Sequence, residues 1–175
     1  KTESAGSLSH LAEALTPKFR VVVPDLASDA DIHTVRRLMD DLGISAANVA
    51  GRGSGAALAM GLATAKPQRV KRLVVIAADP SITSPASGIL CPALFLAAGD
   101  EEDAATAMSS AAPRGRFAAL PENDESLATL LGGFLAERLS VFDARELRSA
   151  FGSFMTGVTI VTTAGVDGQP RGFTA

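Results

Sequence analysis

The sequence contains neither tryptophan nor tyrosine, and aromatic residues make up only 5% of its 175 positions. It has a single cysteine, Cys91, which excludes an internal disulfide framework and is typical of a reducing compartment such as the cytoplasm. Because Cys91 directly precedes the apolar run 92–98, we expect a buried small side chain there and not a reactive thiol.

Two classes of partner are disfavoured by what is missing. No apolar stretch reaches the roughly 18 residues that a membrane span needs, and no signal-peptide pattern opens the sequence. A net charge of −3 without a long basic run argues against a nucleic-acid surface. Hydrophobic residues, at 47%, supply ample material for a packed core. We therefore expect a globular cytoplasmic protein with no membrane or nucleic-acid partner.

Helical and strand patterns alternate through the first 139 residues. Apolar residues at helical spacing predict helices near 8–16, 32–42, 56–65, 103–111 and 127–139. Continuous apolar runs predict buried strands at 19–23, 70–77, 93–98 and 117–120, and a further strand ends near Ala50. Asp29 or Asp31 can cap the second helix, and Gly43 can end it. The alternation predicts a three-layer α/β fold, with a mostly parallel, doubly wound sheet between helices.

The pattern changes after residue 139. A helix is expected over 143–154, followed by a β-branched run at 157–163. Asp167-Gly168 is a strong hairpin signal, and a second strand follows at about 171–175. Because a hairpin is not the next unit of a doubly wound sheet, we place a domain boundary at 139–142, between domains 1–139 and 140–175.

A strand, a tight glycine turn and an apolar helix meet at Gly51-Arg52-Gly53-Ser54-Gly55. This is the geometry of a nucleophile elbow, which requires small residues two positions before and two after the nucleophile. Gly51 and Gly55 satisfy that requirement around Gly53. If Ser54 were the nucleophile, Arg52 would occupy a position that must be small, so Ser54 is interpreted as the start of the helix and kept only as an alternative nucleophile.

The stretch 48–59, followed by Lys66-Pro67-Gln68-Arg69-Val70, resembles the α/β-hydrolase family. In that family the nucleophile stands about fourteen positions before the corresponding proline, and Gly53 stands fourteen before Pro67. The resemblance therefore implies an α/β-hydrolase fold whose nucleophile slot is filled by glycine.

The other catalytic slots of the family are also altered. The resemblance places an acid after strand 93–98, where Glu102 or Asp103 stands, and a histidine after the last strand, where Asp124 stands instead. The two histidines of the chain, His10 and His33, are on early helices. Without a base no hydroxyl is activated, so we expect no catalytic residue, only the degenerate slots Gly53, Glu102 and Asp124.

Two further family elements are not found in the sequence. Only residues 78–91 separate the strands between which the family inserts a lid. The central strand and the loop that helps to form the oxyanion hole would lie before Lys1. We therefore expect a lidless domain that is N-terminally incomplete, in a fragment of a longer protein.

The same glycine turn supports rival interpretations. Gly51–Ala56 matches the dinucleotide fingerprint G-x-G-x-x-A, and Asp79 stands slightly late for the acid that this fingerprint requires. The Pro67 register favours the hydrolase interpretation. A dinucleotide- or anion-binding module at this turn, and an active esterase or lactonase with an atypical nucleophile, remain the alternatives.

Residues 143–175 resemble the opening of the flavin reductase family, whose members are split-barrel, FMN-binding proteins. The match runs from Leu147-Arg148-Ser149-Ala150-Phe151 through Thr162-Thr163 to Gly172-Phe173-Thr174-Ala175. The resemblance implies that Thr174 and Ala175 begin the segment that grips the flavin. It also implies a homodimer formed through the reductase domain.

Together the two resemblances predict a fusion protein. A degenerate hydrolase-like module precedes an NAD(P)H:flavin oxidoreductase domain that supplies reduced FMN or FAD to a two-component monooxygenase. For the fragment itself we expect neither a bound cofactor nor a metal.

Overall fold

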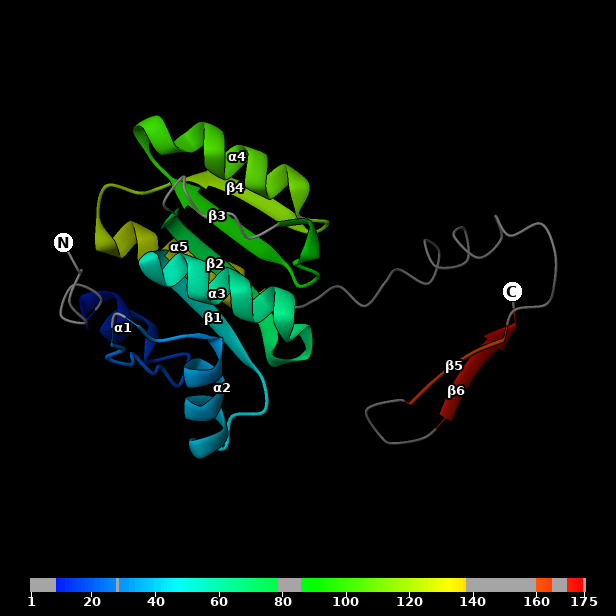
Figure 1. Cartoon of the computed structure of the whole chain (residues 1–175). Coiled ribbons are helices and arrows are strands. Elements are labelled where there is room, and N and C mark those ends of the chain that lie inside the picture. Colours follow the sequence, from blue (N-terminus) through cyan, green and yellow to red (C-terminus); the bar gives the residue numbers. More distant parts are fainter. Residues whose placement is uncertain (1–8, 28, 79–85, 138–159, 165–169, 175) are drawn as a thin grey trace. The chain divides into compact units, whose positions relative to one another are not determined.

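The computed structural model describes residues 9–27, 29–78, 86–137, 160–164 and 170–174 (Figure 1). The chain divides into two compact units, Lys1–Ala136 and Glu137–Ala175. The expected boundary at 139–142 and the expected helix at 143–154 lie outside the described residues.

Four parallel strands, arranged in sequence order, form the sheet of the first unit: β1 (Ala47–Gly53), β2 (Val70–Ala78), β3 (Ala93–Ala97) and β4 (Gly115–Ala119). Val75 of β2 is in register with Phe95 of β3, which is in register with Phe117 of β4. All five residues of β3 are buried, as a parallel strand covered on both faces requires. The predicted parallel α/β sheet is confirmed.

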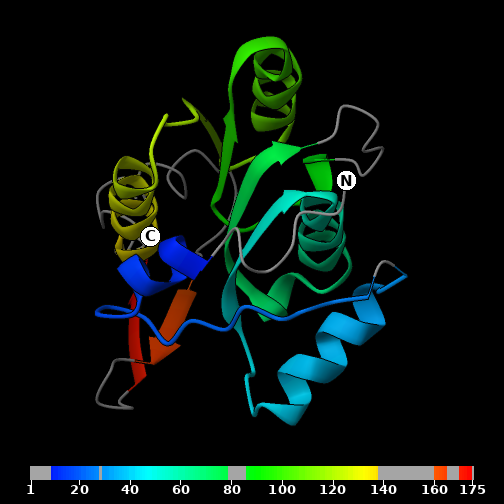
Figure 2. The same ribbon diagram turned by 90° about the vertical axis from the view of Figure 1, so that its left-hand side faces the viewer.

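Helices cover both faces of this sheet (Figures 1 and 2). One face packs against α2 (Ile32–Asp41), α3 (Ser54–Ala65) and α4 (Glu102–Ala111). The other packs against α1 (Ser9–Leu15) and α5 (Asp124–Ala136). The described residues of this unit also include three short 3-10 helices: η2 (Pro67–Arg69), η3 (Ala86–Gly88) and η4 (Gly99–Glu101). Alternate residues of β2 enter the two cores, with Leu73 and Val75 on one side and Val74 and Ile76 on the other.

The prediction of a buried strand at 19–23 is wrong. The segment between α1 and α2 forms no strand, and Val22 and Val23 are 43% and 39% exposed. Among the described residues β1 pairs only with β2, at the edge of the sheet. Figure 2 shows the segment crossing β1 instead of running along it. A β-branched run becomes a strand only where it lies alongside a neighbouring strand and shares its hydrogen bonds, and this segment does not run alongside β1.

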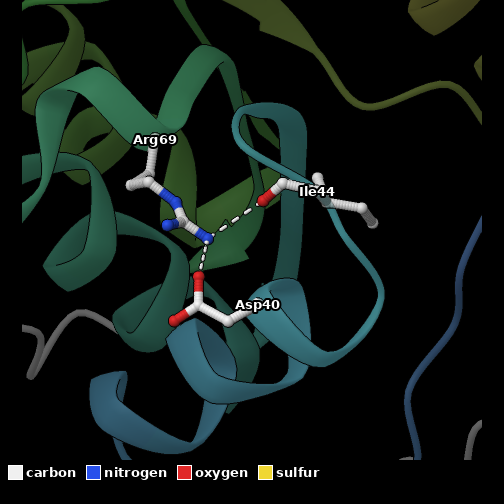
Figure 3. Close-up of polar contacts among 3 residues, drawn as sticks. All are labelled: Asp40, Ile44 and Arg69. Atoms are coloured by element: carbon white, nitrogen blue, oxygen red, sulfur yellow. Dashed lines mark hydrogen bonds and ion pairs between the residues drawn. The ribbon is translucent and has the colours of Figure 1, made fainter.

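Arg69 fastens the end of α2 to the turn that precedes β2 (Figure 3). Its Nη2 donates to Asp40 Oδ1 at 2.7 Å and to the carbonyl oxygen of Ile44 at 3.0 Å. Gly43, at φ 67°, ends the helix as expected. One guanidinium thus holds a helix end, a loop and a strand start together.

Asp31 is the residue that caps α2. Its Oδ1 accepts hydrogen bonds from Thr34 N at 2.8 Å and from Thr34 Oγ1 at 2.9 Å. The bond from the Thr34 backbone N–H is the main cause that lowers the pKa of Asp31 below its ordinary value of 3.8. The carboxylate therefore stabilises the folded state above pH 3.8, and this contribution is lost as the pH falls through the lower, folded value.

We accordingly expect Asp31→Ala to lower the Tm at pH 7, and the difference from the wild type to shrink towards about pH 2. Thermal melts followed by circular dichroism across this range measure the effect. Asp29→Ala, at the other candidate cap, is the control and should leave the Tm unchanged. A Tm difference for Asp31→Ala that persists undiminished at the lowest pH contradicts the assignment.

The second unit contains an antiparallel pair, β5 (Ile160–Ala164) and β6 (Pro170–Thr174), with Ile160 opposite Thr174. This confirms the predicted strand pairing, while the Asp167-Gly168 turn lies outside the described residues. In the part of the chain that the structure describes, no helix is long and apolar enough to cross a membrane.

Candidate functional site

The glycine turn joins β1 to α3 without an intervening residue. β1 continues beyond the expected Ala50 to Gly53, and α3 begins at Ser54, as expected. Gly53 has φ 53° and ψ −121°, a conformation that glycine adopts freely and that strains other residues. A strained strand-to-helix turn of this kind is the defining feature of a nucleophile elbow.

The two glycines that flank Gly53 have different roles. A Cβ on Gly51 would lie 2.3 Å from the backbone oxygen of Gly55, so position 51 admits no side chain. A Cβ on Gly55 would meet nothing within 4 Å. The structure therefore requires glycine at position 51, whereas position 55 would tolerate a side chain, although small residues were expected to be required at both.

The space above the turn is open. A Cβ on Gly53 would also meet nothing within 4 Å, so the position that carries a nucleophile in an elbow has room for a side chain and lacks one. Ser54 is exposed at the first position of α3.

The three positions that the sequence predicts to be degenerate slots share the carboxyl edge of the sheet. Because the strands are parallel, the segments that follow β1, β3 and β4 all leave at this edge, where open α/β sheets bind ligands. Gly53 ends β1, Glu102 begins α4 after β3, and Asp124 begins α5 after β4. Positive φ angles at Ala77 (45°) and Gly99 (61°) turn the chain sharply at the ends of β2 and β3.

Short-range hydrogen bonds form at or beside the two acidic positions, Glu102 and Asp124. Glu102 Oε1 accepts a hydrogen bond from Gly99 N at 3.3 Å and so closes its own turn. Asn123 Oδ1 accepts from Ser126 N at 2.8 Å and caps α5, which leaves the carboxylate of Asp124 without a capping role. Asp103, the alternative acid, is exposed on α4.

Neither histidine belongs to a segment that follows β1, β3 or β4. His33 is exposed on α2, and His10 is exposed on α1. His10 instead lines a groove with Asp124 and Glu125, between α1 and α5. The sequence gives no signal for this meeting, because 114 positions separate His10 from Asp124 and the two belong to different helices.

The sequence also singled out Cys91, Asp79, Thr174 and Ala175. Cys91 is buried, and burial raises the pKa of its thiol, so the side chain is protonated at neutral pH and behaves as a small hydrophobe. Thr174 is the last residue of β6, whereas Ala175 and Asp79 lie outside the described residues. Within the described ranges no group of three or more metal-ligating side chains comes together.

Gly53→Ser tests whether a serine at this turn is sufficient for ester hydrolysis. We expect the serine to fit sterically, to lower the free energy of unfolding by about 1–2 kcal/mol because of the positive φ, and to add no ester hydrolysis. The reason is that no histidine follows β3 or β4 to act as the base. Turnover of p-nitrophenyl acetate and urea unfolding measure the two effects, with Ser54→Ala as the control. A tenfold gain in turnover over the wild type would contradict this expectation.

Comparisons with known proteins separate the two parts of the chain. No model of a known protein family matches it. Over 41 residues it is 63% identical to the reductase component of the flavin-dependent trigonelline monooxygenase of Acinetobacter baylyi, which covers 23% of this chain and 13% of that protein. Over 35 residues it is 63% identical to a probable flavin reductase of Rhizobium meliloti, covering 20% and 11%.

A third relative is the reductase subunit of stachydrine N-demethylase from Rhizobium meliloti, 53% identical over 38 residues, which cover 22% of this chain and 16% of that protein. The chain thus spans less than a fifth of the length of these relatives. A short segment similar to flavin reductases is what the resemblance of 143–175 predicts.

Solved structures share the fold of the larger part. An enol-lactonase from Burkholderia xenovorans superposes with a TM-score of 0.66 at 15% identity, covering 77% of this chain and 87% of that one. A meta-cleavage product hydrolase from Pseudomonas fluorescens gives a TM-score of 0.65 at 14% identity, covering 75% and 85%. At this identity the likeness concerns the fold, which is the α/β-hydrolase fold predicted from the Gly53–Pro67 register.

Proposed function

Because the chain joins an α/β-hydrolase fold to a segment similar to flavin reductases, we propose that it belongs to a bifunctional protein whose hydrolase-fold module is non-catalytic. The observation that carries the proposal is Gly53. Gly53 has the backbone conformation expected of a nucleophile in an elbow, and there is open space where a side chain would project. The two histidines of the chain lie elsewhere in the sequence, His10 on α1 and His33 on α2. No histidine stands among the residues after β3 and β4 to act as the base for a hydroxyl at Ser54.

The chemistry of the whole protein is assigned to the reductase part. We propose that it transfers a hydride from NAD(P)H to FMN or FAD and releases the reduced flavin to a monooxygenase, in line with the names of the relatives. Thr174 and Ala175 would begin the flavin-binding segment, after a boundary at 139–142. A homodimer would form through the reductase domain. The hydrolase-fold module would serve a structural or interaction role.

The test uses the protein from the complete open reading frame that carries this sequence. NADH or NADPH oxidation with added FMN or FAD is followed at 340 nm, and p-nitrophenyl ester hydrolysis is measured on the same preparation. We expect flavin-dependent oxidation and no ester turnover above buffer. Robust ester turnover that Ser54→Ala abolishes would overturn the non-catalytic assignment and support the esterase or lactonase alternative. Absence of flavin reduction would overturn the reductase assignment.

One observation favours a second candidate for the glycine turn. No side chain caps the N-terminus of α3, so its first N–H groups are available to an anion at Gly51–Ala56. Titration with phosphate, monitored at the backbone amides of residues 53–56, tests this binding function.

A further inference from the structure

A groove of about 460 Å³ runs between α1 and α5, which pack together on one face of the sheet (Figure 2). Leu11 and Leu15 of α1 enter the core beside Leu127 and Leu131 of α5. Small residues, Ala14, Ala128 and Gly132, form the floor of the groove next to this contact. A Cβ added at Gly132 would lie 3.9 Å from Leu15 Cδ2, so this position of the floor has room for an alanine in ordinary van der Waals contact with Leu15.

Helical spacing places charged side chains along both walls. His10 stands one turn before Ala14 on α1, and Lys18 follows in the turn where its N–H donates to the Leu15 carbonyl at 3.1 Å. Asp124 stands one turn before Ala128 on α5, and Glu125 one turn before Thr129. One wall is therefore basic and the other acidic.

The charges on the two walls do not neutralise one another. Among the described residues no salt bridge or hydrogen bond joins Lys18 or His10 to Asp124 or Glu125, although all four line the same groove. The capping role at α5 belongs to Asn123, so neither carboxylate is occupied there. The groove therefore presents separated charges of opposite sign over an uncharged floor.

We propose that this groove binds a small zwitterion that carries one carboxylate and one cationic nitrogen, of the amino-acid or betaine class. The carboxylate lies towards Lys18 and His10, and the cationic nitrogen lies towards Asp124 and Glu125. A molecule with a single charge would pair with the residues of one wall and leave those of the other wall without a partner. The volume falls within the range of small-molecule sites, about 300–1,000 Å³. His10 and the three charged side chains, Lys18, Asp124 and Glu125, are exposed, so the affinity is expected in the millimolar range.

The experiment titrates the ¹⁵N-labelled chain 1–175 with glycine betaine and follows the backbone amides by NMR. We expect saturable shifts at residues of both walls and of the floor. Acetate and tetramethylammonium chloride, which each carry one of the two charges, should bind at least about tenfold more weakly.

Single variants assign the two walls. Lys18→Gln and Glu125→Gln should each weaken betaine binding by about tenfold, because each leaves one charge of the zwitterion without a partner. Lys18→Arg should retain binding, and Lys71→Gln, at an exposed position on β2 outside the groove, should leave it unchanged. Equal responses to acetate, tetramethylammonium and betaine would overturn the proposal. So would unchanged affinity in both Lys18→Gln and Glu125→Gln, or shifts that do not saturate.

Discussion

Gly51→Ala is expected to lower the free energy of unfolding by about 3 kcal/mol or more. The added Cβ would lie 2.3 Å from the backbone oxygen of Gly55 and 2.8 Å from the Cα of Ala56. These are main-chain atoms at the start of a buried helix, so the clash is relieved only if the strand and helix move apart. Overpacking of a well-packed site typically costs about 1–3 kcal/mol and more where the backbone must shift. Urea unfolding followed by circular dichroism gives the value.

Gly55→Ala is the matched control for this substitution. It makes the same chemical change four residues away, where the added Cβ meets nothing within 4 Å. Because alanine is favoured over glycine inside a helix, we expect this variant to gain about 0.5–1 kcal/mol. A lower free energy of unfolding for Gly51→Ala and a higher one for Gly55→Ala would show that the backbone at position 55 approaches position 51 too closely for a side chain. Equal effects at the two positions would show that the turn is more plastic than its geometry indicates.

Phe95→Ala is expected to destabilise the first unit by about 3–5 kcal/mol. Phe95 is fully buried at the centre of β3, and its core cluster includes residues of α3, α4 and β2. Removing the ring leaves a cavity that these elements would have to collapse to fill. Since small domains are stable by only about 5–15 kcal/mol, the loss is a large fraction of the total. The variant should show a clear fall in its urea midpoint.

Phe117→Ala provides the comparison in the neighbouring strand. Phe117 is in register with Phe95 but is only partly buried on β4. The same truncation should therefore cost clearly less than at Phe95. If Phe117→Ala lowers the free energy of unfolding as much as Phe95→Ala or more, the assignment of Phe95 to the centre of the core is wrong.

The sequence was informative wherever one local pattern determines the structure. The continuous apolar runs of β2 and β3 predict buried parallel strands, since both faces must be covered. The order of strand, glycine turn and apolar helix predicts the elbow, and the resemblance to the α/β-hydrolase family sets its register; the structure has Gly53 at the turn between β1 and α3. The sequence narrows the cap of α2 to Asp29 or Asp31, and the hydrogen bond from Thr34 N in the structure identifies Asp31.

Features that depend on distant neighbours could not be predicted in this way. Residues 19–23 have the composition of a buried strand, but whether they form one depends on an adjacent ladder elsewhere in the fold. The groove between α1 and α5 brings His10 to Asp124, and no periodicity links positions in two separate helices. The freedom at Gly55 is likewise visible only once the atoms around it are placed.

The edge position of β1 has a consequence for how the chain behaves in solution. On the side away from β2, the described residues supply no ladder to its backbone N–H and C=O groups. β1 also carries neither proline nor lysine, the residues that most often protect an exposed edge from another chain. Such an edge is a template for intermolecular pairing, so the colloidal stability of this chain should depend on protein concentration, and dilute handling should reduce aggregation through this edge.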